Sequence, residues 1–122
     1  KDSYGLIFRG SASGDPSHGY ALAFSCDGHY RVLRIDSGDP YTFTELISWT
    51  VSEFIRTGPA QNNILGIQGD HDTFSIYANG YHIGTFVDDW YSFGRYGVFI
   101  NAGNSLNYTY RVDLIRIWRH LD

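Results

Sequence analysis

The chain has 122 residues, a net charge of −4, a single cysteine and no methionine. Its length predicts one domain with a core of its own, and a hydrophobic content of 43% against 18% charged residues excludes wholesale disorder. The negative charge argues against nucleic acid or an anionic membrane as the main partner, and no apolar run is long enough to span a bilayer. The lone Cys26 forbids an internal disulfide, and we expect it to be buried as a small hydrophobic residue.

Short runs that alternate apolar and polar residues recur along the chain, and each run ends at a turn signal. Aromatic residues make up 17% of the chain, which also has 14 glycines, a composition typical of strands and tight turns. Only residues 52–56 could form a helical turn. Strands are predicted over residues 4–9, 19–25, 29–36, 41–50, 62–69, 73–78, 81–87, 96–102 and 108–118. This spacing indicates an all-β, antiparallel two-sheet sandwich or barrel.

The Asp27-Gly28 turn predicts the register of the first hairpin, in which Leu22 lies opposite Leu33. The core face would then carry Tyr20, Leu22, Phe24, Leu33 and Ile35, and the other face Ala21, Ala23, Ser25, Tyr30, Val32 and Arg34. Small residues flanked by Tyr30 and Arg34 describe a shallow surface on which a ligand could lie. They equally describe an ordinary solvated face or a tight packing layer.

The Asn79-Gly80 turn fixes a second hairpin, because this dipeptide favours a two-residue type I′ turn. The predicted register pairs Tyr77 with His82, Ile76 with Ile83, and Phe74 with Thr85. Alternation along the strands then separates a core face from an outer face. The predicted core face holds Phe74, Ile76, Ala78, Tyr81 and Ile83, and the outer face holds Ser75, Tyr77, His82 and Phe86.

The order of these segments resembles a known family. The pattern Phe-x-Ile-Tyr-x-Asn-Gly over residues 74–80, followed by Gly94-Arg-Tyr-Gly-Val98 and Val112–Trp118, is similar to the bacterial concanavalin A-like lectin/glucanase jelly-roll domains, which include the 3-keto-disaccharide hydrolase-like domains. The resemblance covers nearly the whole chain and implies one concanavalin-like jelly-roll domain over residues 1–122, within a longer protein. Because the family usually has one or two strands before the segment that matches Leu6–Arg9, we expect the N-terminal strand or strands to be missing.

The segment Asp88-Asp89-Trp90-Tyr91 is the first candidate binding site, because it combines a loop position with two carboxylates and two aromatic rings. Sugar sites stack the apolar face of a ring on Trp or Tyr and use a few polar groups for the hydroxyls. Asp88 and Asp89 are also candidate Ca²⁺ ligands, and the resemblance implies a structural Ca²⁺. Alternatively, these aspartates serve the turn alone and Trp90 folds back over one end of the sandwich.

Two further faces are alternative sugar sites, one with Tyr77 and His82 and one with Tyr30 and Arg34. Trp49 and Trp118 alternate with apolar residues inside predicted strands, so we expect both in the core.

Catalysis has little support in the sequence. Glycoside hydrolysis needs two carboxylates flanking the scissile bond, and the only glutamates are Glu45 and Glu53, on either side of a probable strand end. Gly10–Gly14 contains serines, but no helix follows to build a nucleophile elbow. No catalytic residue is therefore assigned.

The sequence favours a non-catalytic, lectin-like module of an extracellular or cell-surface protein that binds carbohydrate. One alternative is a structural or assembly subunit that contacts another protein chain through a sheet edge, for which the apolar segment Ile115–Trp118 is the candidate. The third is a glycoside-active enzyme of the 3-keto-disaccharide hydrolase type.

Overall fold

The structure is a computed structural model that describes residues 2–11, 18–37, 40, 42–58 and 61–101. These residues form eight strands. The strands are β1 (Ser3–Gly10), β2 (Gly19–Ser25), β3 (His29–Asp36), β4 (Thr42–Val51), β5 (Leu65–Asp70), β6 (Thr73–Ala78), β7 (Tyr81–Val87) and β8 (Arg95–Asn101). They match the predicted strands within three residues at each end. The predicted strand over residues 108–118, with Trp118 and the proposed edge at Ile115–Trp118, lies outside the described residues.

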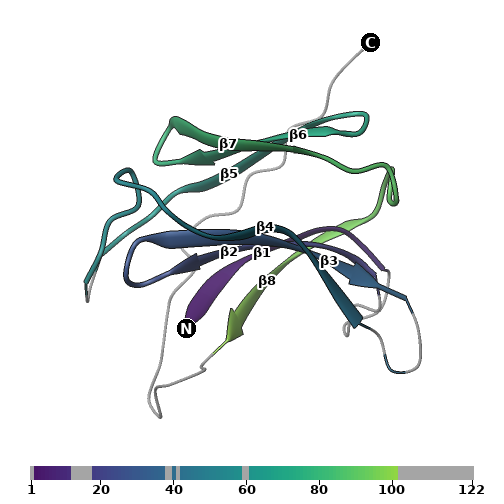
Figure 1. Cartoon of the computed structure of the whole chain (residues 1–122), viewed down its shortest axis with the longest axis horizontal. Helices are drawn as coiled ribbons and strands as arrows, with labels where there is room; N and C mark the ends of the chain where they lie inside the picture. The colour runs from purple at the N-terminus through teal and green to yellow at the C-terminus, as the bar shows by residue number, and fades with distance from the viewer. Residues whose placement is uncertain (1, 12–17, 38–39, 41, 59–60, 102–122) are drawn as a thin grey trace.

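The strands form two antiparallel sheets, which Figure 1 shows as two layers. The first sheet has the order β4-β3-β2-β1-β8 and the second the order β5-β6-β7. Residues 52–56 form a hydrogen-bonded turn rather than a helix, with the Ile55 amide donating to the Ser52 carbonyl over 3.3 Å. The fold is therefore all-β and consistent with a β-sandwich, as the strand pattern predicts. None of the described residues forms a helix long and apolar enough to cross a membrane.

The core lies between the two sheets and consists mainly of aromatic and branched aliphatic side chains. Phe74 of β6 is only 1% exposed, and its ring centroid lies 4.8 Å from that of Phe86, 5.3 Å from that of Tyr20 and 5.6 Å from that of Phe8. The buried cluster comprises Phe8, Tyr20, Leu22, Phe24, Tyr30, Val32, Ile55, Phe74, Ile76, Ala78 and Phe86. Both sheets contribute to this cluster, so each sheet buries its apolar face against the other.

The β6–β7 hairpin confirms the predicted pairing next to its turn and departs from it further away. Tyr77 lies opposite His82, as predicted, but Ile76 pairs with Gly84 and not with Ile83. The register shifts between Ile76 and Tyr77 because Ile83 is an extra residue in β7, a β-bulge. An Asn-Gly turn fixes only the pairs beside it, and the bulge resets every pair beyond.

The bulge changes which residues of β7 face the core. Phe86 lies opposite Phe74 in place of the predicted Thr85, and it is buried although the alternation predicted it on the outer face. Tyr81 was predicted in the core and is more than half exposed, with its ring stacked on Phe54. One inserted residue reverses the side on which the following side chains lie.

The β2–β3 hairpin contradicts the predicted register. Leu22 lies opposite Val32, one residue from the predicted Leu33. The loop holds three residues rather than two, and Gly28, with a φ of 87°, donates its amide to the Ser25 carbonyl over 3.2 Å. A three-residue turn ending in a left-handed glycine shifts the pairing by one residue relative to a two-residue turn.

This shift exchanges the two faces of β3 over residues 30–34, whereas Ile35 is buried, as predicted. Tyr30 and Arg34, predicted on an outer surface, face the interior together with Val32, whereas Leu33 leaves the core face. The shallow outer surface predicted around Tyr30 and Arg34 therefore does not exist.

Two further expectations about single residues are wrong. Cys26 is the first residue of the three-residue turn and is exposed, because it lies beyond the end of β2 and outside the core between the sheets. Trp49 is half-buried on the outer face of the five-stranded sheet, where the Arg31 guanidinium lies 4.7 Å from its ring centroid. The bulges in the β3–β4 pairing move Trp49 away from the core face that alternation predicts for it.

Candidate functional site

The predicted Asp88–Tyr91 segment lies in the loop that leads from β7 to β8, at the right-hand end of the sandwich in Figure 1. The Asp88 amide donates to the Asp72 carbonyl over 2.9 Å, which fixes the start of the loop. Arg9 of β1 holds its far side, because Nη1 donates to the Tyr91 carbonyl over 3.0 Å and to the His71 carbonyl over 2.7 Å. The loop is therefore fastened to both sheets.

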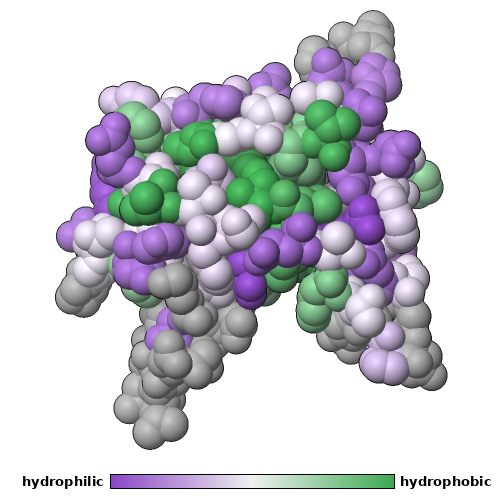
Figure 2. All heavy atoms as spheres, viewed as in Figure 1, coloured by the Kyte–Doolittle hydropathy of each residue, from purple (hydrophilic) through white to green (hydrophobic). Residues whose placement is uncertain are grey.

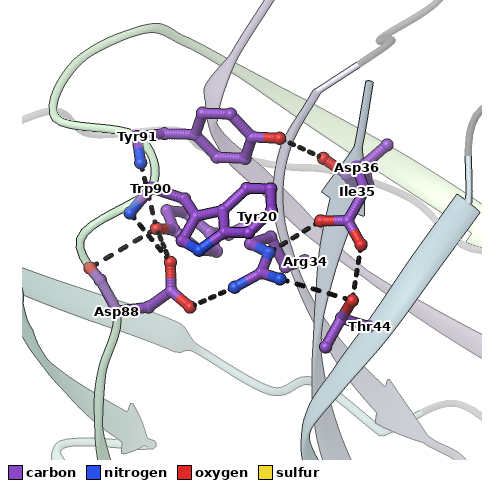
Figure 3. Close-up of polar contacts among 8 residues, drawn as sticks. All are labelled: Tyr20, Arg34, Ile35, Asp36, Thr44, Asp88, Trp90 and Tyr91. Carbon is purple, nitrogen blue, oxygen red and sulfur yellow. Dashed lines mark hydrogen bonds and ion pairs between the residues drawn. The ribbon is translucent and has the colours of Figure 1, made fainter. Parts of the chain in front are cut away.

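Asp88 is the centre of a buried polar network at this end (Figure 3). Arg34 Nη1 donates to Asp88 Oδ2 over 2.7 Å, the Trp90 amide donates to Oδ1 over 3.1 Å, and the Tyr20 hydroxyl also donates to Oδ1. The Asp88 and Arg34 side chains are only 7% and 11% exposed. Both carboxylate oxygens are thus occupied, as a buried charge requires.

Asp36 is the second carboxyl group that Arg34 contacts. Arg34 Nε donates to Asp36 Oδ1 over 2.7 Å, and the Thr44 hydroxyl donates to Asp36 Oδ2. Burial opposes ionisation of Asp36, but the hydrogen bonds from Thr44 and Arg34 outweigh it and lower the pKa of the Asp36 carboxyl from its ordinary 3.8. The guanidinium therefore lies between the carboxyl groups of Asp36 and Asp88.

Burial, together with the hydrogen bond to Asp88, raises the pKa of the Tyr20 hydroxyl well above its ordinary range. The phenol stays protonated and acts as a donor to Asp88 wherever the protein is folded near neutral pH. The same phenol oxygen accepts the Tyr91 amide over 3.3 Å. Tyr20 therefore couples the core of the five-stranded sheet to the candidate loop.

Trp90 lies over this network and is 58% exposed. The Arg34 guanidinium carbon is 3.6 Å from the centroid of its ring, close enough for a cation–π interaction. Figure 3 shows the indole covering the guanidinium. Trp90 thus combines the two predicted alternatives, because it covers one end of the sandwich and also presents a large aromatic surface to solvent.

Tyr91 is turned inward instead. Its hydroxyl donates to the Ile35 carbonyl over 2.8 Å, and its ring packs edge-on against Tyr20 and flat against His18. Asp89, the remaining residue of the segment, is exposed. Of the two predicted aromatic rings, Trp90 is the one that offers a surface for a ligand.

The predicted alternatives Tyr30 and His82 come together at the opposite end. Both line an open cleft of about 270 Å³ between β3, β4 and β7, at the left-hand end in Figure 1. Tyr77 lies edge-on against His82 with ring centroids 5.5 Å apart, and its hydroxyl donates to Gln68 Oε1 over 3.2 Å. The structure therefore divides the predicted residues between two ends, with Arg34, Asp88, Asp89, Trp90 and Tyr91 at one and Tyr30, Tyr77 and His82 at the other.

The sequence analysis missed four residues that shape the Trp90 end. These are Arg9, Tyr20, Asp36 and Thr44. The signal that could have found one of them, Asp36, is the β3 pattern Arg34-x-Asp36, because residues two apart share a face of a strand. No signal relates Arg9 to residues 62 or 82 positions away.

A cation at Asp88 would have to displace existing bonds, because Arg34, Tyr20 and Trp90 already occupy its oxygens. In the described part of the chain, no group of three or more His, Cys, Asp and Glu side chains is placed to hold a metal ion.

Comparison with known proteins adds no identification. No family model, no curated protein and no solved structure matches this chain.

Proposed function

We propose that the chain is a non-catalytic, lectin-like module of an extracellular or cell-surface protein, and that it binds carbohydrate on Trp90. The exposed indole, held by a buried guanidinium 3.6 Å from its ring centroid, carries the proposal. Sugars present apolar faces that stack on flat aromatic rings. A ring that is already fixed loses little conformational freedom on binding, so more of the stacking energy appears as affinity.

The surroundings of Trp90 support a ligand with hydroxyl groups. Asp89, next in sequence, is exposed and offers carboxylate oxygens as hydrogen-bond acceptors. The network beneath the indole, with Arg34, Asp36 and Asp88, pairs one positive with two negative side chains and is buried. A neutral glycan therefore suits this end better than an acidic one.

The finer fold assignment belongs to the same proposal. A concanavalin-like jelly roll is built from two antiparallel sheets. The observed pair of antiparallel sheets supports the assignment at that level.

The positions of the two glutamates support the proposal that the module is non-catalytic. Glu45 lies on the outer face of the five-stranded sheet, 4.0 Å from Arg31, whereas Glu53 lines the cleft between the sheets. Of the two, only Glu53 lines that cleft, whereas the two carboxylates of a glycosidase flank one glycosidic bond. Replacing each by Gln should leave carbohydrate binding on Trp90 intact.

The alternative of an assembly subunit rests on exposed apolar side chains. Figure 2 shows apolar residues gathered near the centre of the viewed face and ringed by polar ones. Contiguous apolar surface of this kind commonly marks contacts with another protein. Among the described residues, the large exposed apolar side chains are Phe43, Val51, Ile64, Tyr81, Val87, Trp90, Phe93, Tyr96 and Val98.

Trp90→Ala tests the carbohydrate proposal, with Phe74→Ala as its matched aromatic control. We expect Trp90→Ala to weaken glycan binding by about 1–3 kcal/mol, the contribution of an aromatic anchor, while the domain stays folded. Phe74→Ala should cost about 3–5 kcal/mol of folding stability, as for other buried phenylalanines. Glycan-array binding and thermal melts of both variants measure the two effects.

The two readouts separate the possible failures. A Trp90→Ala melting temperature as low as that of Phe74→Ala would make Trp90 a core residue and the site assignment wrong. A wild-type chain that binds no glycan on the array would contradict the proposed function itself.

A further inference from the structure

We infer that the cleft at the opposite end of the sandwich is a second binding site, which takes one neutral sugar ring or a polyol of that size. The cleft has a volume of about 270 Å³, near the lower limit of small-ligand pockets. Its walls come from both sheets and from the turn after β4, with Tyr30, Ser52, Glu53, Phe54 and His82 among the lining residues.

Some of the groups that line the cleft can still donate or accept a hydrogen bond beyond those that they already form. The Tyr30 hydroxyl donates to the Ile83 carbonyl over 2.9 Å, so its oxygen can still accept a bond. Ser52 Oγ accepts the Phe54 amide over 3.3 Å, so its proton can still be donated. The cleft thus offers both kinds of partner, and a sugar hydroxyl both donates and accepts.

The charged side chains at the cleft disfavour an anionic ligand. Glu53 is exposed and places a carboxylate at the cleft, while no lysine or arginine is among the described residues that line it. A phosphate or carboxylate ligand would meet repulsion without compensation. His82 adds an imidazole whose Nε2 lies 2.9 Å from Thr85 Oγ1, a group able to bond a neutral hydroxyl.

Phe54 supplies the apolar wall, and the turn that carries it is held in place. Its ring stacks on Tyr81 with centroids 4.3 Å apart and planes at 15°. Asn79 Nδ2 donates to the Phe54 carbonyl over 2.7 Å and to Asn63 Oδ1 over 2.9 Å. These bonds fasten the turn to the β6–β7 hairpin, so the cleft is formed before a ligand arrives.

The cleft is separate from the Trp90 surface. It lies at the start of β3, whereas Arg34 under Trp90 lies near the end of that strand, which has eight residues. The whole strand spans roughly 25 Å at about 3.3 Å per residue. The cleft shares its ligand chemistry with the proposed function but does not need the Trp90 site to bind.

An NMR titration of the wild-type chain tests this inference. The probes are D-glucose, D-galactose, D-mannose and N-acetyl-D-glucosamine, with choline as a cationic comparison. We expect at least one sugar to give saturable amide shifts at residues lining the cleft, such as Tyr30, Ser52 and Glu53. Glu53→Gln should weaken that binding about tenfold, because it replaces a charge-assisted hydrogen bond by a neutral one.

Glu45→Gln is the matched control, because Glu45 is the other glutamate of the chain and lies on the outer face. It should leave the affinity unchanged. Absence of saturable shifts at the cleft with all four sugars, or saturation there by choline alone, would overturn the inference. Shifts confined to the Trp90 loop would overturn the inference and leave the proposed function intact. Shifts confined to the cleft would support the inference and contradict carbohydrate binding on Trp90.

Discussion

The two ends of this sandwich differ in the side chains that the same strand, β3, contributes to them. At the Trp90 end, β3 contributes Arg34, whose guanidinium is bonded to Asp36 and Asp88 and covered by an indole. At the cleft end, the same face of β3 contributes Tyr30, which lines the cleft and donates its hydroxyl proton to the Ile83 carbonyl. At one end Arg34 and the two carboxyl groups bond to one another, and at the other the lining groups keep unused hydrogen-bonding capacity.

The difference follows from which charges each end contains. A guanidinium with two carboxylates can be withdrawn from water, because its donors and their oxygens bond to one another. The cleft end has Glu53 without a cation among the described residues that line it, so its carboxylate remains hydrated. Charge pairing therefore buries the polar groups of the Trp90 end, which we call the closed end. At the cleft end, the open end, Glu53 has no cation among the described lining residues and stays hydrated.

The largest effect should follow from breaking the closed end. Arg34→Met should destabilise the fold by about 3–5 kcal/mol, because it leaves the carboxylate of Asp88 buried without its cation. Arg31→Met, three positions away on the outer face, should cost about 1 kcal/mol or less, because its pair with Glu45 is longer and more exposed. Urea denaturation of both variants measures the difference. Equal losses in the two variants would show that the buried network has no special role.

A smaller effect should follow from crowding the open end. A Cβ at Gly84 would lie 2.8 Å from the Tyr30 hydroxyl oxygen, so Gly84→Ala must displace the bond from Tyr30 to the Ile83 carbonyl. We expect a loss of about 1–3 kcal/mol, typical of overpacking. Gly97→Ala is the control, because its Cβ would meet only Ile7 at 3.9 Å. If Gly84→Ala is as stable as Gly97→Ala, Tyr30 is not held as described.

The two hairpins show how far the sequence determines the fold. Alternation and turn signals located every strand of the described chain within three residues. The strand registers were harder to predict from the sequence, because Asp27-Gly28 is typical of a two-residue turn while the chain forms a three-residue turn. The difference between these turns is small in local energy, and packing of Tyr30 and Val32 into the core favours the longer one.

The candidate site was predictable only where its residues are neighbours in sequence. Asp88–Tyr91 could be singled out from its composition, but Arg34 became part of the same site only through the register of β3. Tyr30 and His82 appeared to belong to separate faces, and the structure places them in one cleft. Contacts between sheets depend on bulges and turn lengths, which side-chain alternation alone does not report.

The smallest effect should be a pH dependence confined to the closed end. Because folding lowers the pKa of Asp36 from 3.8, the unfolded chain binds a proton there first as the pH falls. The stability that Asp36 contributes is therefore present above 3.8 and is lost as the pH falls through the lower folded value. One such group changes the free energy of unfolding by at most about 1.4 kcal/mol per pH unit.

Thr44→Val tests this directly, because it removes one of the two hydrogen bonds that lower the pKa of Asp36. Urea denaturation between about pH 5 and pH 3 should show a shallower loss of stability in Thr44→Val than in the wild type. Trp90 fluorescence, followed in parallel, should report the change, since its indole rests on Arg34, the other partner of Asp36. A slope identical to that of the wild type would mean that Asp36 does not stabilise the closed end through its charge.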